Sequence, residues 1–174
     1  MRFARREKHA MIALAMVPGL GPARIRSLVS KFGSASGVFR AGYGDLQQVR
    51  GIGSSIAREI SSVQPWQAAR DQLRRASRCG ARHLCPSGRD YPVLLRQIFD
   101  PPPVLWARGR MDVDLGHAIA VVGSRRPSER GRRFAYDLAL ELARRGWTIV
   151  SGLAYGIDAS AHRGALEAGG VTAA

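Results

Sequence analysis

The chain has 174 residues and carries 27 basic against 13 acidic side chains, which gives a formal net charge of +14. A hydrophobic content of 45% and a charged content of 23% are ordinary for a globular protein, and no apolar run approaches the roughly 18 residues of a membrane span. The basic N-terminal residues lead into no secretory signal, and Cys79 and Cys85 fit no zinc or redox motif, so we expect a cytoplasmic protein with reduced thiols.

The surplus of positive charge favours a polyanionic partner, of which nucleic acid is the commonest. Residues 1–64 and residues 65–174 each carry a net charge of +7, so we expect both parts to contribute to a binding face. From charge alone, an acidic membrane surface or an acidic protein is the alternative partner.

Residues 1–64 contain a short internal repeat and predict a helical domain. The segment Val17-Pro-Gly-Leu-Gly21 recurs 32 residues later as Val49-Arg-Gly-Ile-Gly53, and each copy leads into an amphipathic helix. Pro22 suits the first position of the first of these helices, because its missing N–H has no helical partner there. The pattern is similar to a tandem helix-hairpin-helix unit.

In such a unit the glycines allow a tight turn, and the helix that follows presents free N–H groups to a phosphate. The candidates for sequence-independent contact with a DNA backbone are therefore Gly19, Gly21, Gly51 and Gly53. The other interpretation is that these turns only close helical hairpins and pack a core, and the sequence leaves both open.

Residues 65–80 predict a connecting helix, because apolar residues recur at helical spacing from Trp66 to Ala76. Residues 81–110 lose this period. Their prolines favour extended or turn segments, and residues 104–107 predict a short buried strand.

The remaining residues predict a strand–helix–strand–helix unit. Residues 118–122 are continuously apolar, as in a strand buried on both faces, and residues 147–150 form a second strand. Ser128 is the expected N-cap of a helix to about Arg145, and Asp158 the expected cap of a helix to about residue 168. The first of these helices has apolar residues four apart at Phe134, Leu138 and Leu142. The predicted fold class is α/β: an all-α domain over residues 1–64, the connecting helix, and an incomplete Rossmann-like parallel domain over residues 81–174.

Both predicted strands end in glycine–serine turns next to helix starts. Because ligands bind beyond the carboxyl ends of parallel strands, both turns lie on the binding edge. Backbone N–H groups, the hydroxyls of Ser124 and Ser151 and the guanidinium of Arg125 suit phosphate oxygens. The alternative is that the glycines only make tight turns and that Arg125 is solvated.

Neither a dinucleotide fingerprint nor a Walker A motif is present, and no paired carboxylates or nucleophile–base arrangement stands out. We therefore expect no cofactor, no metal and no catalytic residue. His162 follows Asp158 by four residues and is expected to order the turn there. An enzyme that uses the same edge for a nucleotide or phosphoribosyl substrate is the alternative function.

Several segments, in order along the chain, resemble the DNA-processing protein A family (DprA, also called Smf). They are Tyr91-Pro92, 100–109, 120–125, 149–154 and 156–158, followed by His162. The resemblance implies a non-enzymatic cytoplasmic protein that binds single-stranded DNA, protects it during natural transformation and loads the RecA recombinase. It also implies a homodimer, no membrane partner, and a sterile-alpha-motif-like (SAM-like) helical domain ahead of the Rossmann-like domain.

The resemblance further implies that the two turns line the DNA pocket. The residues so assigned are Gly123, Ser124, Arg125, Ser151, Gly152, Ala154, Gly156, Ile157 and Asp158, with Arg126 and Tyr155 as secondary candidates. Tyr155 stands where many family members have arginine, and an aromatic ring there suits stacking on a base.

The sequence ends where the family's third Rossmann strand begins. We therefore expect an N-terminal fragment with two main parallel strands and a marginally stable second half, because such a small sheet buries little and leaves an open edge. The dimer and RecA surfaces of the family would then lie outside this chain.

Overall fold

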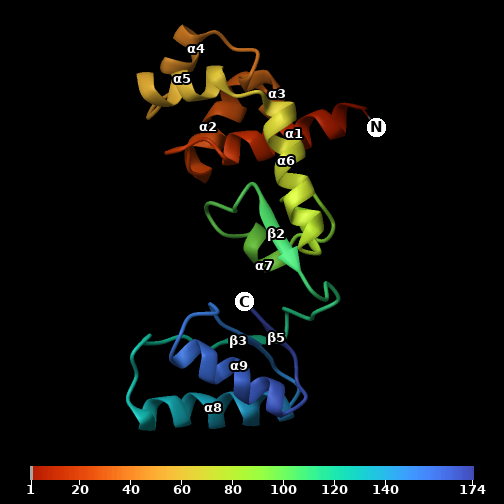
Figure 1. The fold of residues 1–174 in the computed structure, drawn as a ribbon, viewed down its shortest axis with the longest axis vertical. Coiled ribbons are helices and arrows are strands. Elements are labelled where there is room, and N and C mark those ends of the chain that lie inside the picture. Colours follow the sequence, from red (N-terminus) through yellow and green to blue (C-terminus); the bar gives the residue numbers. More distant parts are fainter. Residues whose placement is uncertain (1) are drawn as a thin grey trace. The chain divides into compact units, whose positions relative to one another are not determined.

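The computed structural model describes residues 2–174, with side chains from Arg5 onwards, and it divides into two compact units, Met1–Met111 and Asp112–Ala174. Each unit is built from its own helices and strands (Figure 1). Within the described residues, no helix combines the length and the apolar composition that crossing a membrane requires.

The first half of the Met1–Met111 unit is a small helical bundle, as the sequence predicts. Its helices are α1 (Arg2–Ala15), α2 (Pro22–Phe32), α3 (Ala35–Val38), α4 (Tyr43–Gln47) and α5 (Ser54–Ser62). Apolar side chains from all five pack into one core, which includes the buried residues Leu14, Leu28, Val38, Leu46 and Ile60.

The two copies of the sequence repeat adopt the same turn. Gly19 and Gly51 have φ values of +75° and +84°, a region in which other residues are strained. Gly21 and Gly53 then cap α2 and α5 in extended conformations, and Pro22 takes the first position of α2 as predicted.

Each of these turns also contacts the helix that follows the other copy. A Cβ on Gly19 would lie 3.8 Å from Ile56 of α5, and one on Gly51 would lie 3.3 Å from Arg24 of α2. The repeat therefore builds one core from two interlocked halves.

The second half of this unit consists of α6 (Pro65–Arg78), α7 (Val93–Arg96) and an antiparallel pair, β1 (Ala81–Leu84) and β2 (Leu105–Arg108). The helix predicted over residues 65–80 is present as α6, and it belongs to the same compact unit as the helices before it and the two strands that follow it. The prediction of a buried strand is wrong in its burial, because β2 alternates between half-buried and exposed residues in a two-stranded sheet, and Trp106 is 36% exposed. Neither β1 nor α7 was expected.

The Asp112–Ala174 unit is a parallel α/β unit, as predicted. It contains β3 (Ala118–Ala120), α8 (Glu129–Arg144), β4 (Thr148–Val150), α9 (Ile157–Glu167) and β5 (Thr172–Ala173). The strands are parallel in the order β3-β4-β5, so the sheet has a short third strand beyond the two expected.

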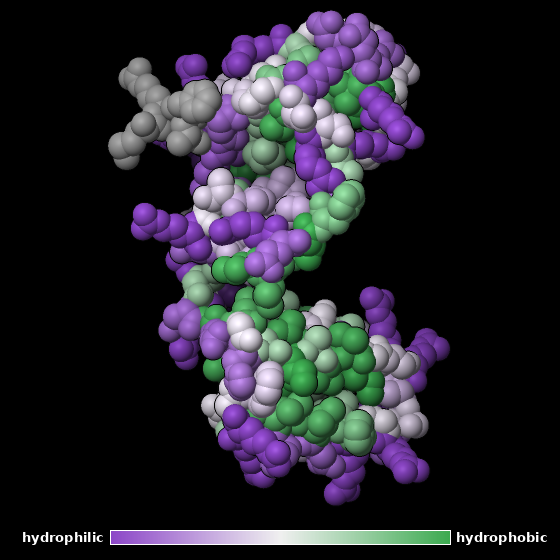
Figure 2. All heavy atoms as spheres, turned by 180° about the vertical axis from the view of Figure 1, so that it is seen from behind, coloured by the Kyte–Doolittle hydropathy of each residue, from purple (hydrophilic) through white to green (hydrophobic). Residues whose placement is uncertain are grey.

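Residues 118–122 are not buried on both faces, contrary to prediction. Ile119 is 36% exposed and Val122 is 71% exposed. The reason is that β3 lies at the edge of the sheet and that α8 and α9 lie on the same side of the strands (Figure 1). Figure 2 shows a broad hydrophobic area on this unit.

The buried stripe of α8 is also shifted by one residue from the expected one. Ala135, Ala139 and Ala143 are buried, whereas Phe134 is 67% exposed. Small residues are needed because α9 comes so close that a Cβ on Gly164 would overlap the carbonyl oxygen of Tyr136.

Candidate nucleic-acid interface

The first turn of the candidate site joins β3 to α8 and is held by two side-chain hydrogen bonds. Ser124 Oγ accepts a bond from the amide of Arg126 at 3.1 Å. Ser128 Oγ accepts one from the amide of Gly131 at 3.2 Å, which confirms its predicted role as the N-cap of α8.

The second turn joins β4 to α9, and two of its polar side chains bond inside the protein. Ser151 is buried, and its hydroxyl donates a hydrogen bond to the carbonyl oxygen of Val121 at 2.7 Å. The buried carboxylate of Asp158 accepts bonds from the amides of Gly152 at 3.2 Å and Ala154 at 3.4 Å. These groups therefore fix the shape of the turn.

The prediction that Asp158 caps α9 is wrong. The N-cap is Gly156, with φ +88° and ψ −122°, a conformation that only glycine adopts readily. This kink lets α9 begin at Ile157, so that Asp158 lies inside the first helical turn and its carboxylate reaches back to the loop. Leu153, which sequence reasoning missed, has φ +53° and is 77% exposed, and nothing in its residue type signals this left-handed position.

The two turns contact each other at one edge of the sheet. The amide of Ile157 donates a hydrogen bond to the carbonyl oxygen of Ser124 at 3.1 Å. A Cβ on Gly156 would overlap that same oxygen, and a Cβ on Gly123 would lie 2.7 Å from Cγ1 of Ile157. Because β3 and β4 are parallel neighbours, their carboxyl ends bring the predicted site residues of both turns together.

The polar groups that face solvent at this edge come mainly from the first turn. Ser124, Arg125 and Arg126 are exposed, and neither guanidinium has an ion pair among the described residues. Tyr155 of the second turn is 86% exposed. Guanidinium and hydroxyl groups bind phosphate oxygens, and an exposed aromatic ring stacks on a base.

His162 ties α9 to the sheet rather than to the turn. Its Nδ1 lies 2.6 Å from the hydroxyl of Thr172, which in turn donates to the carbonyl oxygen of Ile149 at 2.9 Å. The hydrogen bond of His162 is thus made to Thr172 in β5, not within the turn at Asp158 that it was expected to order.

The helix-hairpin-helix glycines lie apart in sequence from these turns. Gly21 and Gly53 are exposed at the starts of α2 and α5, and neither helix has a side-chain cap. Contact between them and DNA stays a prediction. Within the described part of the chain, no three His, Cys, Asp or Glu side chains are grouped to hold a metal ion.

Comparison with known families agrees with both halves of this description. The family model described as SAM-like helix-hairpin-helix tandem matches residues 11–62, which confirms the predicted motif. The family model described as DNA recombination-mediator protein A matches residues 82–174. The chain belongs to this DNA recombination-mediator family.

Relatives in the family are longer than this chain. It is 32% identical to Protein Smf of Synechocystis over 98% of its own length and 44% of that protein. It is 44% identical to the DNA processing protein DprA of Bacillus subtilis, over 49% of this chain and 29% of the relative. The aligned segments thus cover less than half the length of each of these curated relatives.

A solved structure supports the fold. The X-ray structure of DprA from Streptococcus pneumoniae matches with a TM-score of 0.54 at 24% identity, over 98% of this chain and 54% of the other. At this identity the likeness supports the α/β fold with its helical N-terminal part and nothing finer.

Proposed function

We propose that this chain binds single-stranded DNA through the turn edge, by which we mean residues 121–128 and residues 151–157. The observation that carries the proposal is the direct contact between the two turns, which sets the exposed Arg125 and Arg126 beside the second turn. The name of one relative, DNA processing protein DprA, agrees with a DNA ligand.

In this proposal the exposed groups bind and the buried groups hold the shape. Arg125 and Arg126 contact phosphates, the hydroxyl of Ser124 donates to a phosphate oxygen, and Tyr155 stacks on a base. The remaining predicted residues, Gly123, Ser151, Gly152, Ala154, Gly156, Ile157 and Asp158, position the two turns. Binding is then strongly salt-dependent and tolerant of sequence, because it reads the backbone and the faces of the bases.

The test measures binding to a fluorescently labelled 20-nucleotide strand at a series of salt concentrations, with fluorescence anisotropy as the readout. Arg125→Ala removes one charged phosphate contact, which we expect to weaken binding about tenfold and to reduce the salt slope by about 0.7. Arg144→Ala is the matched control, since it removes the same charge from an exposed position of α8 in the same unit. Equal effects of the two substitutions would show that only net charge matters and would reject the turn edge.

Family membership extends the proposal to the complete protein. We infer that it acts in the cytoplasm as a homodimer during natural transformation and recombination, without catalysing a reaction, and that it passes the bound strand to RecA. Assembly of RecA on a strand coated with single-strand-binding protein, with and without the complete protein, tests the transfer. Turnover of a mononucleotide by the complete protein would instead support the enzymatic alternative.

A further inference from the structure

A basic concavity lies in the Met1–Met111 unit, between α1 and α6. It is a groove of about 380 Å³, lined by Arg5, Lys8 and His9 of α1 and by Arg70, Leu73, Arg74 and Ser77 of α6. On each helix these residues recur at three- and four-residue spacing, so each helix contributes one continuous face. We call it the α1–α6 groove.

The charges that line the α1–α6 groove are nearly uncompensated. Four cations line it and no carboxylate does. Among the described ion pairs, one involves a lining cation: Arg74 lies 3.9 Å from Asp71. Asp71 also accepts a hydrogen bond from Gln67 at 3.2 Å. Like charges in one concavity repel one another, so an anion placed there is favoured.

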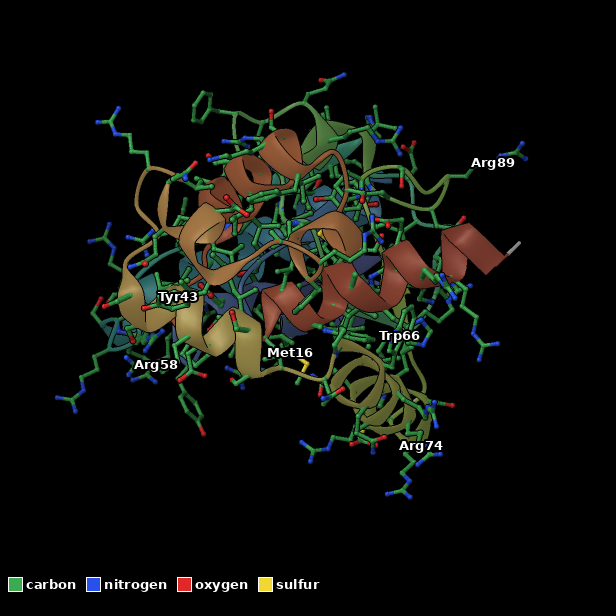
Figure 3. The ribbon with its side chains drawn as sticks, turned by 90° about the horizontal axis from the view of Figure 1, so that it is seen from above. Met16, Tyr43, Arg58, Trp66, Arg74 and Arg89 are labelled. Carbon is green, nitrogen blue, oxygen red and sulfur yellow. The ribbon has the colours of Figure 1, made fainter. Side chains whose placement is uncertain are left out.

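One lining residue, His9, contacts an aromatic side chain that lies outside the lining. His9 is buried, its Nδ1 lies 2.6 Å from the carbonyl oxygen of Arg5, and its ring centroid lies 5.4 Å from that of Trp66. Trp66 is 40% exposed at the start of α6, beside α1 (Figure 3). Proteins hold a single strand with cations along a groove and with aromatic rings that stack on bases, and here the exposed ring stands next to a lining residue.

We propose that the α1–α6 groove binds the sugar–phosphate backbone of single-stranded nucleic acid as a second site. That the polyanion is single-stranded nucleic acid rests on the function proposed above. A concave groove between two helices admits a strand, whereas a bilayer surface favours a basic face that is convex and flanked by apolar side chains. Two sites on one chain raise the apparent affinity for a strand long enough to reach both.

The test compares two double substitutions on one helix. Arg70→Ala with Arg74→Ala removes two cations from the groove, while Arg75→Ala with Arg78→Ala removes two from α6 outside the lining. For a 50-nucleotide dT strand we expect the groove variant to bind at least tenfold more weakly and to lose about 1.4 from the salt slope, and the control to change less than about twofold. Circular dichroism shows whether the double variant keeps its fold. If it does not, Lys8→Gln removes a lining cation from α1 instead and repeats the test.

Parallel measurements separate this inference from the proposed function. Loss of binding in Arg125→Ala with no difference between groove and control variants would overturn the groove and leave the turn edge standing. The reverse result would support the groove and reject the turn edge. Vesicles of phosphatidylglycerol and phosphatidylcholine form the last arm: a groove variant that loses vesicle binding yet keeps strand binding overturns the nucleic-acid assignment.

Discussion

The amide of Ile157 donates a hydrogen bond to the carbonyl oxygen of Ser124 at 3.1 Å, and this bond joins two turns that are about thirty residues apart in sequence. It also means that the first free N–H of α9 is used inside the protein. The electropositive groups left for a ligand at the turn edge are therefore mainly side chains, above all Arg125 and Arg126. This distinguishes the site from a glycine loop that binds phosphate with its amides alone.

Replacing Gly156 with alanine tests the contact between the turns. The backbone conformation alone costs about 1–3 kcal/mol for a residue with a Cβ, and here the Cβ would also overlap the Ser124 carbonyl oxygen. We expect a lower thermal unfolding midpoint and weaker strand binding.

Gly169→Ala is the control for this prediction. Gly169 also has a positive φ, +67°, but a Cβ there meets nothing within 4 Å. Gly169→Ala should lower the free energy of unfolding by about 1 kcal/mol and leave strand binding unchanged. If Gly156→Ala lowers the unfolding midpoint and strand binding no more than Gly169→Ala does, the two turns do not pack as described.

Much of the fold could be predicted because glycine, proline and serine act locally. Pro22 and Ser128 marked helix starts, and α2 and α8 begin at these positions. These residues restrict the backbone whatever surrounds them, so the sequence contains the signal.

The errors arose where distant packing decides. Phe134 and Ala135 both belong to stripes with helical spacing, and only the close approach of Gly164 on α9 makes the alanine stripe the buried one. The partner of the Asp158 carboxylate depended likewise on the kink at Gly156, which places the helix start two residues earlier than a capping aspartate would. Hydrophobic spacing alone carries no information on such contacts.

The Asp158 carboxylate should stabilise the second turn. Asp158→Ala removes the acceptor of the Gly152 and Ala154 amides, and burying unpaired donors costs about 1–3 kcal/mol. Hydrogen exchange should show faster exchange of these two amides. Asp137→Ala is the control: it removes an exposed carboxylate of the same unit, 3.7 Å from Arg133, and should lower the free energy of unfolding by less than about 1 kcal/mol. If the Gly152 and Ala154 amides stay protected in Asp158→Ala, the described hydrogen bonds are contradicted.

Tyr91 anchors the proline-rich segment of the first unit. It is buried, and its hydroxyl donates a hydrogen bond to the carbonyl oxygen of Pro102 at 2.9 Å. Tyr91→Phe should therefore cost about 1 kcal/mol in chemical denaturation. Burial also raises the pKa of Tyr91 above 10, so the wild type should lose stability above pH 10, where the unfolded state releases the proton first.

Tyr43→Phe is the control, since Tyr43 is 42% exposed and its hydroxyl lies 3.5 Å from the carbonyl oxygen of Ser54. It should leave both the stability and its dependence on alkaline pH nearly unchanged. The same alkaline loss in wild type and Tyr91→Phe would assign that loss to another group.

His83 should make the first unit sensitive to acid. Burial, followed by the nearby Lys8 charge, lowers the pKa of His83 from 6.5 to about 4, so the unfolded state binds a proton first as the pH falls. Stability should therefore decrease as the pH falls from about 6.5 to 4, measured by urea unfolding with the fluorescence of Trp106, whose ring centroid lies 5.6 Å from that of His83. His83→Gln should flatten this dependence. Lys8→Gln should raise the pKa of His83 toward 6.5, because one repelling charge is gone, and so make the loss of stability smaller. His117→Gln removes an exposed histidine from the other unit and should retain the wild-type profile; a profile that is equally steep in His83→Gln would show that other groups cause the acid sensitivity.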